Sequence, residues 1–145
     1  MTPDPVLPRI ELGSWETVGP DASRLRFEVF VDEQKVPAEI ELDEHDPVSL
    51  HALARDADGR AVGTGRLLPD GHIGRVAVGA GQRRRGVGDA IMRALMQAAR
   101  ERGLAAVELS AQVHAAGFYR RLGFIEEGDV YLEAGIEHVT MRRRV

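Results

Sequence analysis

The residues best suited to chemistry lie in a glycine- and arginine-rich loop near the middle of the chain. An arginine triplet at 83–85 is followed by Gly86 and Gly88, and an apolar run, Val76–Val78, precedes it. Glycine lets the backbone approach a phosphate closely, and the free N–H groups at the start of a helix favour an anion. Arginines add charge-assisted hydrogen bonds. The loop is therefore a candidate phosphate site, or alternatively an arginine-rich turn that caps a helix.

Two better-known phosphate motifs do not fit the spacing of this loop. Gly81 and Gly86 are spaced as in the phosphate loop of nucleoside triphosphatases, but Val87 and Gly88 stand where Lys and Ser/Thr are required. The dinucleotide fingerprint needs a third glycine at the position that Ile91 occupies. Both nucleotide-binding interpretations are therefore excluded.

An acidic segment is the second feature that suggests a ligand. Between residues 32 and 46 the only base is Lys35, against seven acids: Asp32, Glu33, Glu39, Glu41, Asp43, Glu44 and Asp46. Such a concentration of negative charge attracts cations and raises their local concentration. The alternative interpretation is an acidic loop that is simply solvated.

The elements that must position these segments follow from the hydrophobic spacing. We expect strands at 9–17, 49–55, 61–68, 72–78, 105–111, 124–131 and 137–143, and helices from about 20 to 34, 86 to 102 and 114 to 122. The strands at 49–78 form an antiparallel meander, and the strand–helix–strand passage at 72–111 implies a right-handed parallel crossover. The expected fold is α/β (α+β): a single domain over 1–145, with a mixed central sheet of about six to seven strands and flanking helices.

Composition limits the classes of function. The chain has 145 residues, 43% hydrophobic and 29% charged, with no cysteine and a formal net charge of −4. Cysteine nucleophiles, thiolate metal sites and disulfides are excluded. The acidic balance argues against a nucleic-acid binder, and no apolar run reaches the length of a membrane span. We expect a cytoplasmic protein without a metal site.

Two segments together resemble the GNAT superfamily of N-acetyltransferases. Arg83-x-x-Gly86-x-Gly88, entered from the strand ending Val76-Ala77-Val78, looks like the pyrophosphate-binding motif of that superfamily. The segment from Gln112 to Phe124 looks like its second motif, a short helix with a tyrosine and a closing Gly-Phe. A narrower likeness to the ElaA-like branch includes Phe30-Val31-x-Glu33-Gln34, Ala111-Gln112-x-His114 and Gly135-Ile136-x-His138.

The resemblance implies a site for acetyl-CoA, used as a co-substrate. The main chain at 76–78 would pair with the pantetheine arm, the loop at 83–88 would hold the pyrophosphate, and Gln112 would touch the arm where the family often has asparagine. Tyr119 would protonate the leaving thiolate as general acid. The cofactor-binding residues so implied are Val76, Ala77, Val78, Arg83, Arg84, Arg85, Gly86, Val87, Gly88, Gln112 and Tyr119.

The general base is less clearly indicated, because the strand His72–Val78 carries no carboxylate where many relatives have a glutamate. Glu33 is our preferred candidate, with a salt bridge or a solvated helix end as its structural alternative. His51 and His114 are weaker candidates. The residues we expect on the acceptor side are Glu33, Glu41, Asp43, Glu44 and His51.

These features predict an acetyl-CoA-dependent N-acetyltransferase that acts on a primary amine of a small, basic acceptor. The alternative is a CoA-binding sensor or regulatory module without turnover. The expected partner is a small-molecule amine, with a homodimer left open, and neither nucleic acid nor membrane is expected. The acceptor and the acyl length are not indicated by any motif.

Overall fold

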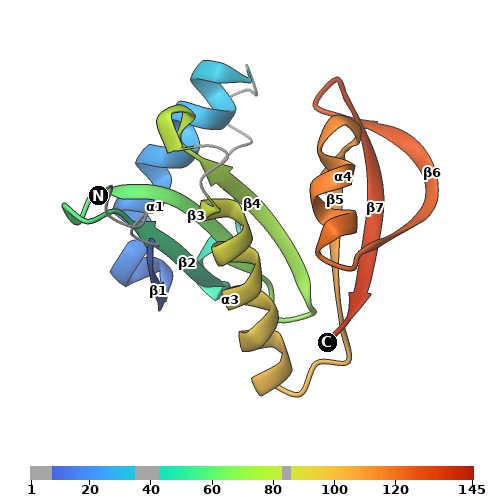
Figure 1. Ribbon diagram of the computed structural model, residues 1–145, viewed down its shortest axis with the longest axis horizontal. Helices are drawn as coiled ribbons and strands as arrows, with labels where there is room; N and C mark the ends of the chain where they lie inside the picture. Colours follow the sequence, from blue (N-terminus) through green and yellow to red (C-terminus); the bar gives the residue numbers. More distant parts are fainter. Residues whose placement is uncertain (1–7, 35–42, 83–85) are drawn as a thin grey trace, which may run out of the picture.

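The protein forms one mixed sheet that holds both halves of the chain together (Figure 1). The computed structural model describes residues 8–34, 43–82 and 86–145. Within these residues the sheet has seven strands in the order β1-β2-β3-β4-β5-β7-β6. Their bounds are β1 Arg9–Gly13, β2 Leu50–Arg55, β3 Ala61–Leu67, β4 His72–Val78, β5 Ala106–Gln112, β6 Ile125–Glu133 and β7 Ile136–Arg144. The predicted fold class and mixed sheet are confirmed.

Neighbouring strands are antiparallel except β4 and β5, which are parallel. The connection between these two strands carries the helix α3 (Val87–Glu101), as expected for a parallel crossover. The other helical segments are α1 (Trp15–Arg26), η1 (Phe27–Glu33), η2 (Asp46–Val48), η3 (Ala80–Gln82), η4 (Val113–Ala115) and α4 (Ala116–Arg121). No helix in the described parts of the chain has the length and apolar character of a membrane span.

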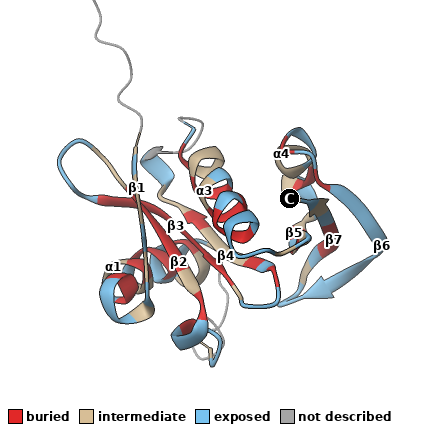
Figure 2. Cartoon of the chain, turned by 90° about the horizontal axis from the view of Figure 1, so that it is seen from below, coloured by how far each residue is buried: buried red, intermediate tan, exposed pale blue. Residues whose placement is uncertain are grey.

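The two long helices cover opposite faces of the sheet (Figure 2). On β3, Gly63 and Gly65 let α3 approach closely: a Cβ at Gly63 would lie 2.6 Å from Val87 Cγ1 and 2.7 Å from Ile91 Cδ1. The apolar stripe of α3, including Ile91 and Leu95, is buried in the main core. This packing fixes the first turn of α3 next to the end of β4.

The N-terminal segment differs from its prediction. The strand expected at 9–17 ends at Gly13, and α1 begins at Trp15, before the helix start expected near residue 20, and continues through Pro20. Val18 and Ala22 share a face and are buried against Leu53, so tertiary packing outweighs the helix-breaking tendency of proline.

Beyond α1 the helix widens into the π-helix η1. The backbone N–H of Gln34 donates to Val29 O five residues earlier, at 3.0 Å. The wider turn buries Val29 and leaves Phe30 and Gln34 on the cavity described below. The π-helix thus connects α1, on one face of the sheet, to the wall of the cavity.

Candidate active site

The central parallel pair of strands diverges and creates a fork in the sheet. β4 and β5 pair only at His72↔Glu108 and Ile73↔Leu109. The register between β3 and β4 shifts just beyond this point, and Arg75 has a φ of 50°. A β-bulge of this kind bends its strand and increases the local twist. Figure 1 shows β4 and β5 separating toward the open end of the fork.

A cavity of about 620 Å³ lies in the fork, and residues from both of the diverging parts of the sheet line it. One wall is formed by η1, β3 and β4, and the other by β5, η4, α4 and the β6–β7 hairpin. Between the walls, Gln112 Nε2 on β5 donates a hydrogen bond of 2.9 Å to Oε1 of Gln34, the residue that directly follows η1. Gln112, predicted to touch the cofactor arm, therefore also joins the two walls.

The backbone on the β4 side suits an extended ligand. Beyond Ile73, the main chain of Val76 and Ala77 has no strand partner on β5. Val76 lines the cavity, Ala77 is buried, and Val78 pairs with Gly63 on β3. An exposed strand edge of this kind accepts a further extended chain by main-chain hydrogen bonds.

The start of α3 forms a cradle at the end of β4. Gly86 has a φ of 80°, and a Cβ built there would meet nothing within 4 Å. A Cβ at Gly88 would lie 3.3 Å from Phe118 and 3.7 Å from Val78, so this turn lies against the open end of the fork. Val87 is buried beneath it. Arg83, Arg84 and Arg85 lie outside the described residues.

Tyr119 on α4 lines the cavity from the opposite side. Its ring packs edge-on against Phe118 and Phe124, with centroid distances of 5.0 and 6.0 Å. Burial raises the pKa of the Tyr119 phenol to about 12. The phenol is therefore protonated at neutral pH, as a proton donor must be.

The acidic segment makes ion pairs on the η1 side of the cavity. Asp46, 2% exposed, accepts hydrogen bonds from Arg26 at 2.8 Å and from Arg66 at 2.9 Å. Asp43 accepts from Arg66 at 2.6 Å and from Arg75 at 3.3 Å. We call these five residues the arginine–aspartate cluster. Two guanidinium groups thus pair with Asp43 and offset the negative charge that it offers to a cationic substrate, and its role on the acceptor side stays a prediction.

The cluster also shifts the pKa values of its carboxyl groups. The hydrogen bond from Arg66 is the main reason that the pKa of Asp43 lies well below its usual range. Burial raises the pKa of Asp46, but hydrogen bonds and positive charge from Arg26 and Arg66 outweigh this effect and lower it overall. Both carboxylates therefore stay charged at neutral pH.

The other predicted acceptor-side residues lie at different depths. His51 is only 1% exposed, its Nε2 lies 2.9 Å from Asp46 O, and its ring packs 4.9 Å from Trp15. Burial lowers the pKa of His51, and the residue is not among the described residues that line the cavity. Contact between His51 and a substrate therefore stays a prediction that this position does not support.

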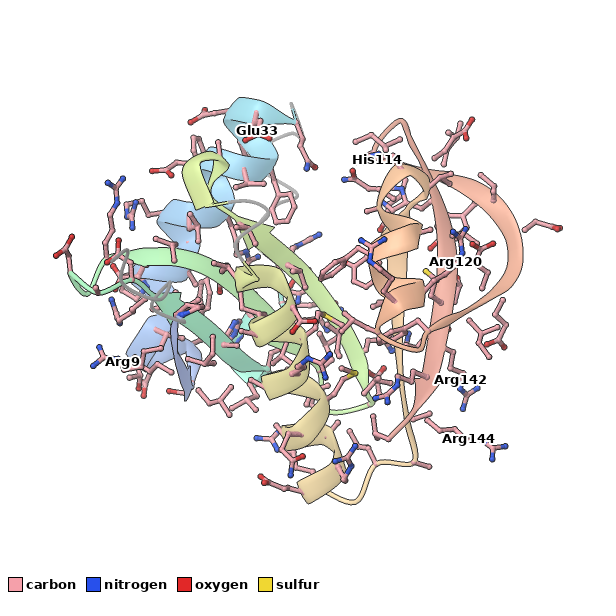
Figure 3. All side chains as sticks on the ribbon, viewed as in Figure 1. Arg9, Glu33, His114, Arg120, Arg142 and Arg144 are labelled. Atoms are coloured by element: carbon pink, nitrogen blue, oxygen red, sulfur yellow. The ribbon has the colours of Figure 1, made fainter. Side chains whose placement is uncertain are left out.

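Two further predicted carboxylates, Glu33 and Glu44, are not among the described residues that line the cavity. Glu33 is exposed at the end of η1, and Figure 3 places it across the opening of the fork from His114. Glu33 is not among the described residues that line the cavity, whereas His114 is. Glu44 is exposed, and Glu41 lies outside the described residues.

Several cavity residues were not selected as site residues from the sequence. Arg66 comes from β3, Ser110 from β5, Glu133 from β6 and His138 from β7. The pairing Gln112↔His138 brings the last of these to the fork. The available signal was strand alternation, since residues at i and i+2 share one face of a sheet, but the sequence did not show that β7 lies next to β5.

Comparisons with known proteins agree with this geometry. Residues 18–145 match the family described as "Acetyltransferase (GNAT) domain". An uncharacterized N-acetyltransferase of Bacillus subtilis, YjcF, is 40% identical over 127 residues, covering 85% of this chain and 90% of that protein.

Solved structures give the same result. An acyl-CoA N-acyltransferase from Pseudomonas aeruginosa is 36% identical with a TM-score of 0.83, over 94% of this chain and 99% of that one. Escherichia coli ElaA is 29% identical with a TM-score of 0.82, over the same shares.

The buried part of the arginine–aspartate cluster makes a prediction about stability. Asp46→Asn leaves Arg26 and Arg66 without their shared carboxylate, so the free energy of unfolding should fall by about 3–5 kcal/mol at pH 7. Because the pKa of Asp46 is lowered by folding, its contribution is present above the unfolded carboxyl pKa of about 3.9 and is lost as the pH falls through the folded value. The variant should therefore lose less stability than the wild type on acidification.

Urea unfolding between pH 7 and pH 3 measures both effects. Glu44→Gln is the matched control, since Glu44 is exposed and belongs to the same acidic segment. Equal stability of Asp46→Asn and Glu44→Gln at pH 7 would show that the cluster does not support the fold.

Proposed function

This chain belongs to the acetyltransferase (GNAT) family, and on that premise we propose that it transfers an acetyl group from acetyl-CoA to a primary amine of a small, basic acceptor. One observation carries the proposal: the edge of β4 at Val76 and Ala77 that does not pair with β5, the start of α3 and the phenol of Tyr119 converge on a single fork in the sheet. Membership of the family supports acyl transfer in general, and the acetyl donor and the amine acceptor are what we propose in addition.

The residues of the fork fit acetyl-CoA, which supplies an acyl group activated as a thioester. The main chain of Val76, Ala77 and Val78 would hold the pantetheine arm as an added strand. Gly86, Val87 and Gly88 at the N-terminus of α3, together with the arginines at 83–85 that precede them in the sequence, would hold the pyrophosphate. Gln112 would orient the arm from the β5 side.

Tyr119 is proposed as the general acid. Its phenol keeps its proton at neutral pH because burial raises its pKa, and it lines the cavity at the fork. A phenol within hydrogen-bond reach of the sulfur protonates it as it leaves, which makes expulsion of the thiolate easier.

The acceptor would enter between η1 and the β6–β7 hairpin, which belong to opposite walls of the cavity. Glu133 is the carboxylate among the described lining residues, and it would attract an ammonium group into the cavity. Glu33 and Glu44 would add negative charge outside the lining, while Asp43 organises arginines instead. An acetyl-CoA-dependent reaction would be carried out inside the cell, which agrees with the expected cytoplasmic location.

The proposed pyrophosphate cradle predicts the effect of a charge at Gly86. Gly86→Asp places a negative side chain where phosphates must approach, so acetyl-CoA binding should be abolished. Gly103→Asp is the matched control: its φ is 78°, a Cβ there also meets nothing within 4 Å, and it follows the other end of α3. Isothermal titration with acetyl-CoA measures both, and equal affinity in the two folded variants would disprove the assignment of the cradle.

The proposed acid predicts a loss of rate. Tyr119→Phe keeps the ring and its edge-on packing but removes the proton donor, so kcat should fall by roughly 10²-fold or more. Affinity for acetyl-CoA should be nearly unchanged. Release of CoA thiol with a panel of primary amines measures kcat, and wild-type turnover in the variant would make Tyr119 a packing residue.

The same amine panel separates the proposed enzyme from its alternative. A wild-type chain that binds acetyl-CoA but transfers nothing to any amine would be a CoA-binding sensor or regulatory module. Turnover with a basic amine supports the proposal.

A further inference from the structure

A histidine and a glutamate face each other on the acceptor side of the cavity. The His138 side chain on β7 is 10% exposed, and its Nε2 lies 3.6 Å from Glu133 Oε2 on β6. Glu133 also accepts a hydrogen bond of 2.9 Å from Ser110 Oγ. Both His138 and Glu133 line the cavity, in the same wall as Tyr119.

The backbone selects which nitrogen of His138 carries the proton. His138 Nδ1 lies 2.7 Å from the carbonyl oxygen of Ile136. A carbonyl oxygen accepts and never donates, so Nδ1 must carry the hydrogen. In the neutral ring, Nε2 is then the unprotonated nitrogen, with its lone pair available to take a proton.

The other histidines of the cavity lack this arrangement. His72 has Asp70 Oδ1 2.9 Å from one ring nitrogen and Glu108 Oε2 3.5 Å from the other. It also lies where β4 and β5 are still paired, away from the open part of the fork. His114 is exposed, and no hydrogen bond to the described residues fixes its tautomer.

We propose that Nε2 of His138 is the general base that takes a proton from the acceptor ammonium, and that Glu133 is a positioning residue that stabilises the imidazolium so formed. This inference rests on the proposed acetyl transfer. An amine is mostly ammonium at neutral pH and becomes a nucleophile only after losing a proton. His138 supplies the base that β4, without a carboxylate, does not.

The protons and bonds of this step balance. The ammonium gives one proton to Nε2, and the nitrogen lone pair then forms the C–N bond as the C–S bond of the thioester breaks. The sulfur takes the proton of Tyr119 Oη, and the second proton lost from the amine nitrogen restores the phenol. The imidazolium returns its proton to solvent, so one proton is released for each amide formed.

The groups around the ring define what a pH experiment reports. Glu133 and Tyr131 face His138 from β6, with the Tyr131 ring stacked at a centroid distance of 6.2 Å. β5 presents the uncharged Gln112 and Ser110, and η4, which packs on β7, carries His114.

The test compares three glutamine variants with the wild type, using one alkylamine acceptor. In His138→Gln, kcat/KM for the amine should fall at least 10²-fold at pH 7. This deficit should shrink as the pH rises toward the pKa of the acceptor amine, because the amine then needs no base to remove its proton. Glu133→Gln should lose about tenfold. His45→Gln, an exposed histidine outside the lining, should keep wild-type activity. Acetyl-CoA affinity, measured by titration, should be unchanged in all three.

A second readout needs no turnover. Nitrogen-15 NMR of the wild-type imidazole should show the tautomer with hydrogen on Nδ1 in the neutral ring, and the opposite tautomer would overturn the proposal. A deficit in His138→Gln that is constant with pH would indicate a merely structural role and would also overturn it. So would a pH-dependent loss in His114→Gln with none in His138→Gln.

The outcomes separate the base from the proposed function. Wild-type turnover with an equally active His138→Gln overturns only the role of His138. Absence of turnover by the wild type with every amine overturns both.

Discussion

The short pairing between β4 and β5 is the constraint on which the rest of the site depends. Two paired residues from each strand hold the sheet together, and the bulge at Arg75 then turns β4 away. If the two strands stayed paired to Val78, the main chain of Val76 and Ala77 would be hydrogen-bonded to β5. No cavity would then separate Tyr119 from η1. The close packing of α3 on Gly63 and Gly65 places the glycine cradle at the end of the same strand.

The acceptor side of the fork is organised by opposite charges. The arginine–aspartate cluster joins the end of α1 and the segment around Asp46 to β3 and β4, because Asp43 and Asp46 pair with arginines from these elements. Across the cavity, Glu133 and His138 come from strands that lie beyond β5. We therefore propose that the β6–β7 hairpin, rather than the acidic segment, supplies the chemistry of the acceptor side.

Local patterns were sufficient for most of the fold. The strand at His72–Val78 and the helix Val87–Glu101 follow from period and turn residues, and the resemblance supplied the cradle and Tyr119. Three features depended on contacts between distant residues. Packing of Val18 and Ala22 carried α1 through Pro20, pairing with Arg66 and Arg75 compensated Asp43, and the pairing of β5 with β7 brought His138 to the cavity. None of these is encoded in a short window of sequence.

The central claim is that the fork between β4 and β5 is the acyl-CoA site, and amide NMR during titration with acetyl-CoA tests it most directly. The account predicts that the amide signals of Val76, Ala77, Gly86 and Gly88 shift with a single saturation curve. The amide signal of Ile125, which begins β6 and is not among the described residues that line the cavity, should stay in place. Saturable binding that leaves the signals of β4 and the start of α3 unmoved would contradict it.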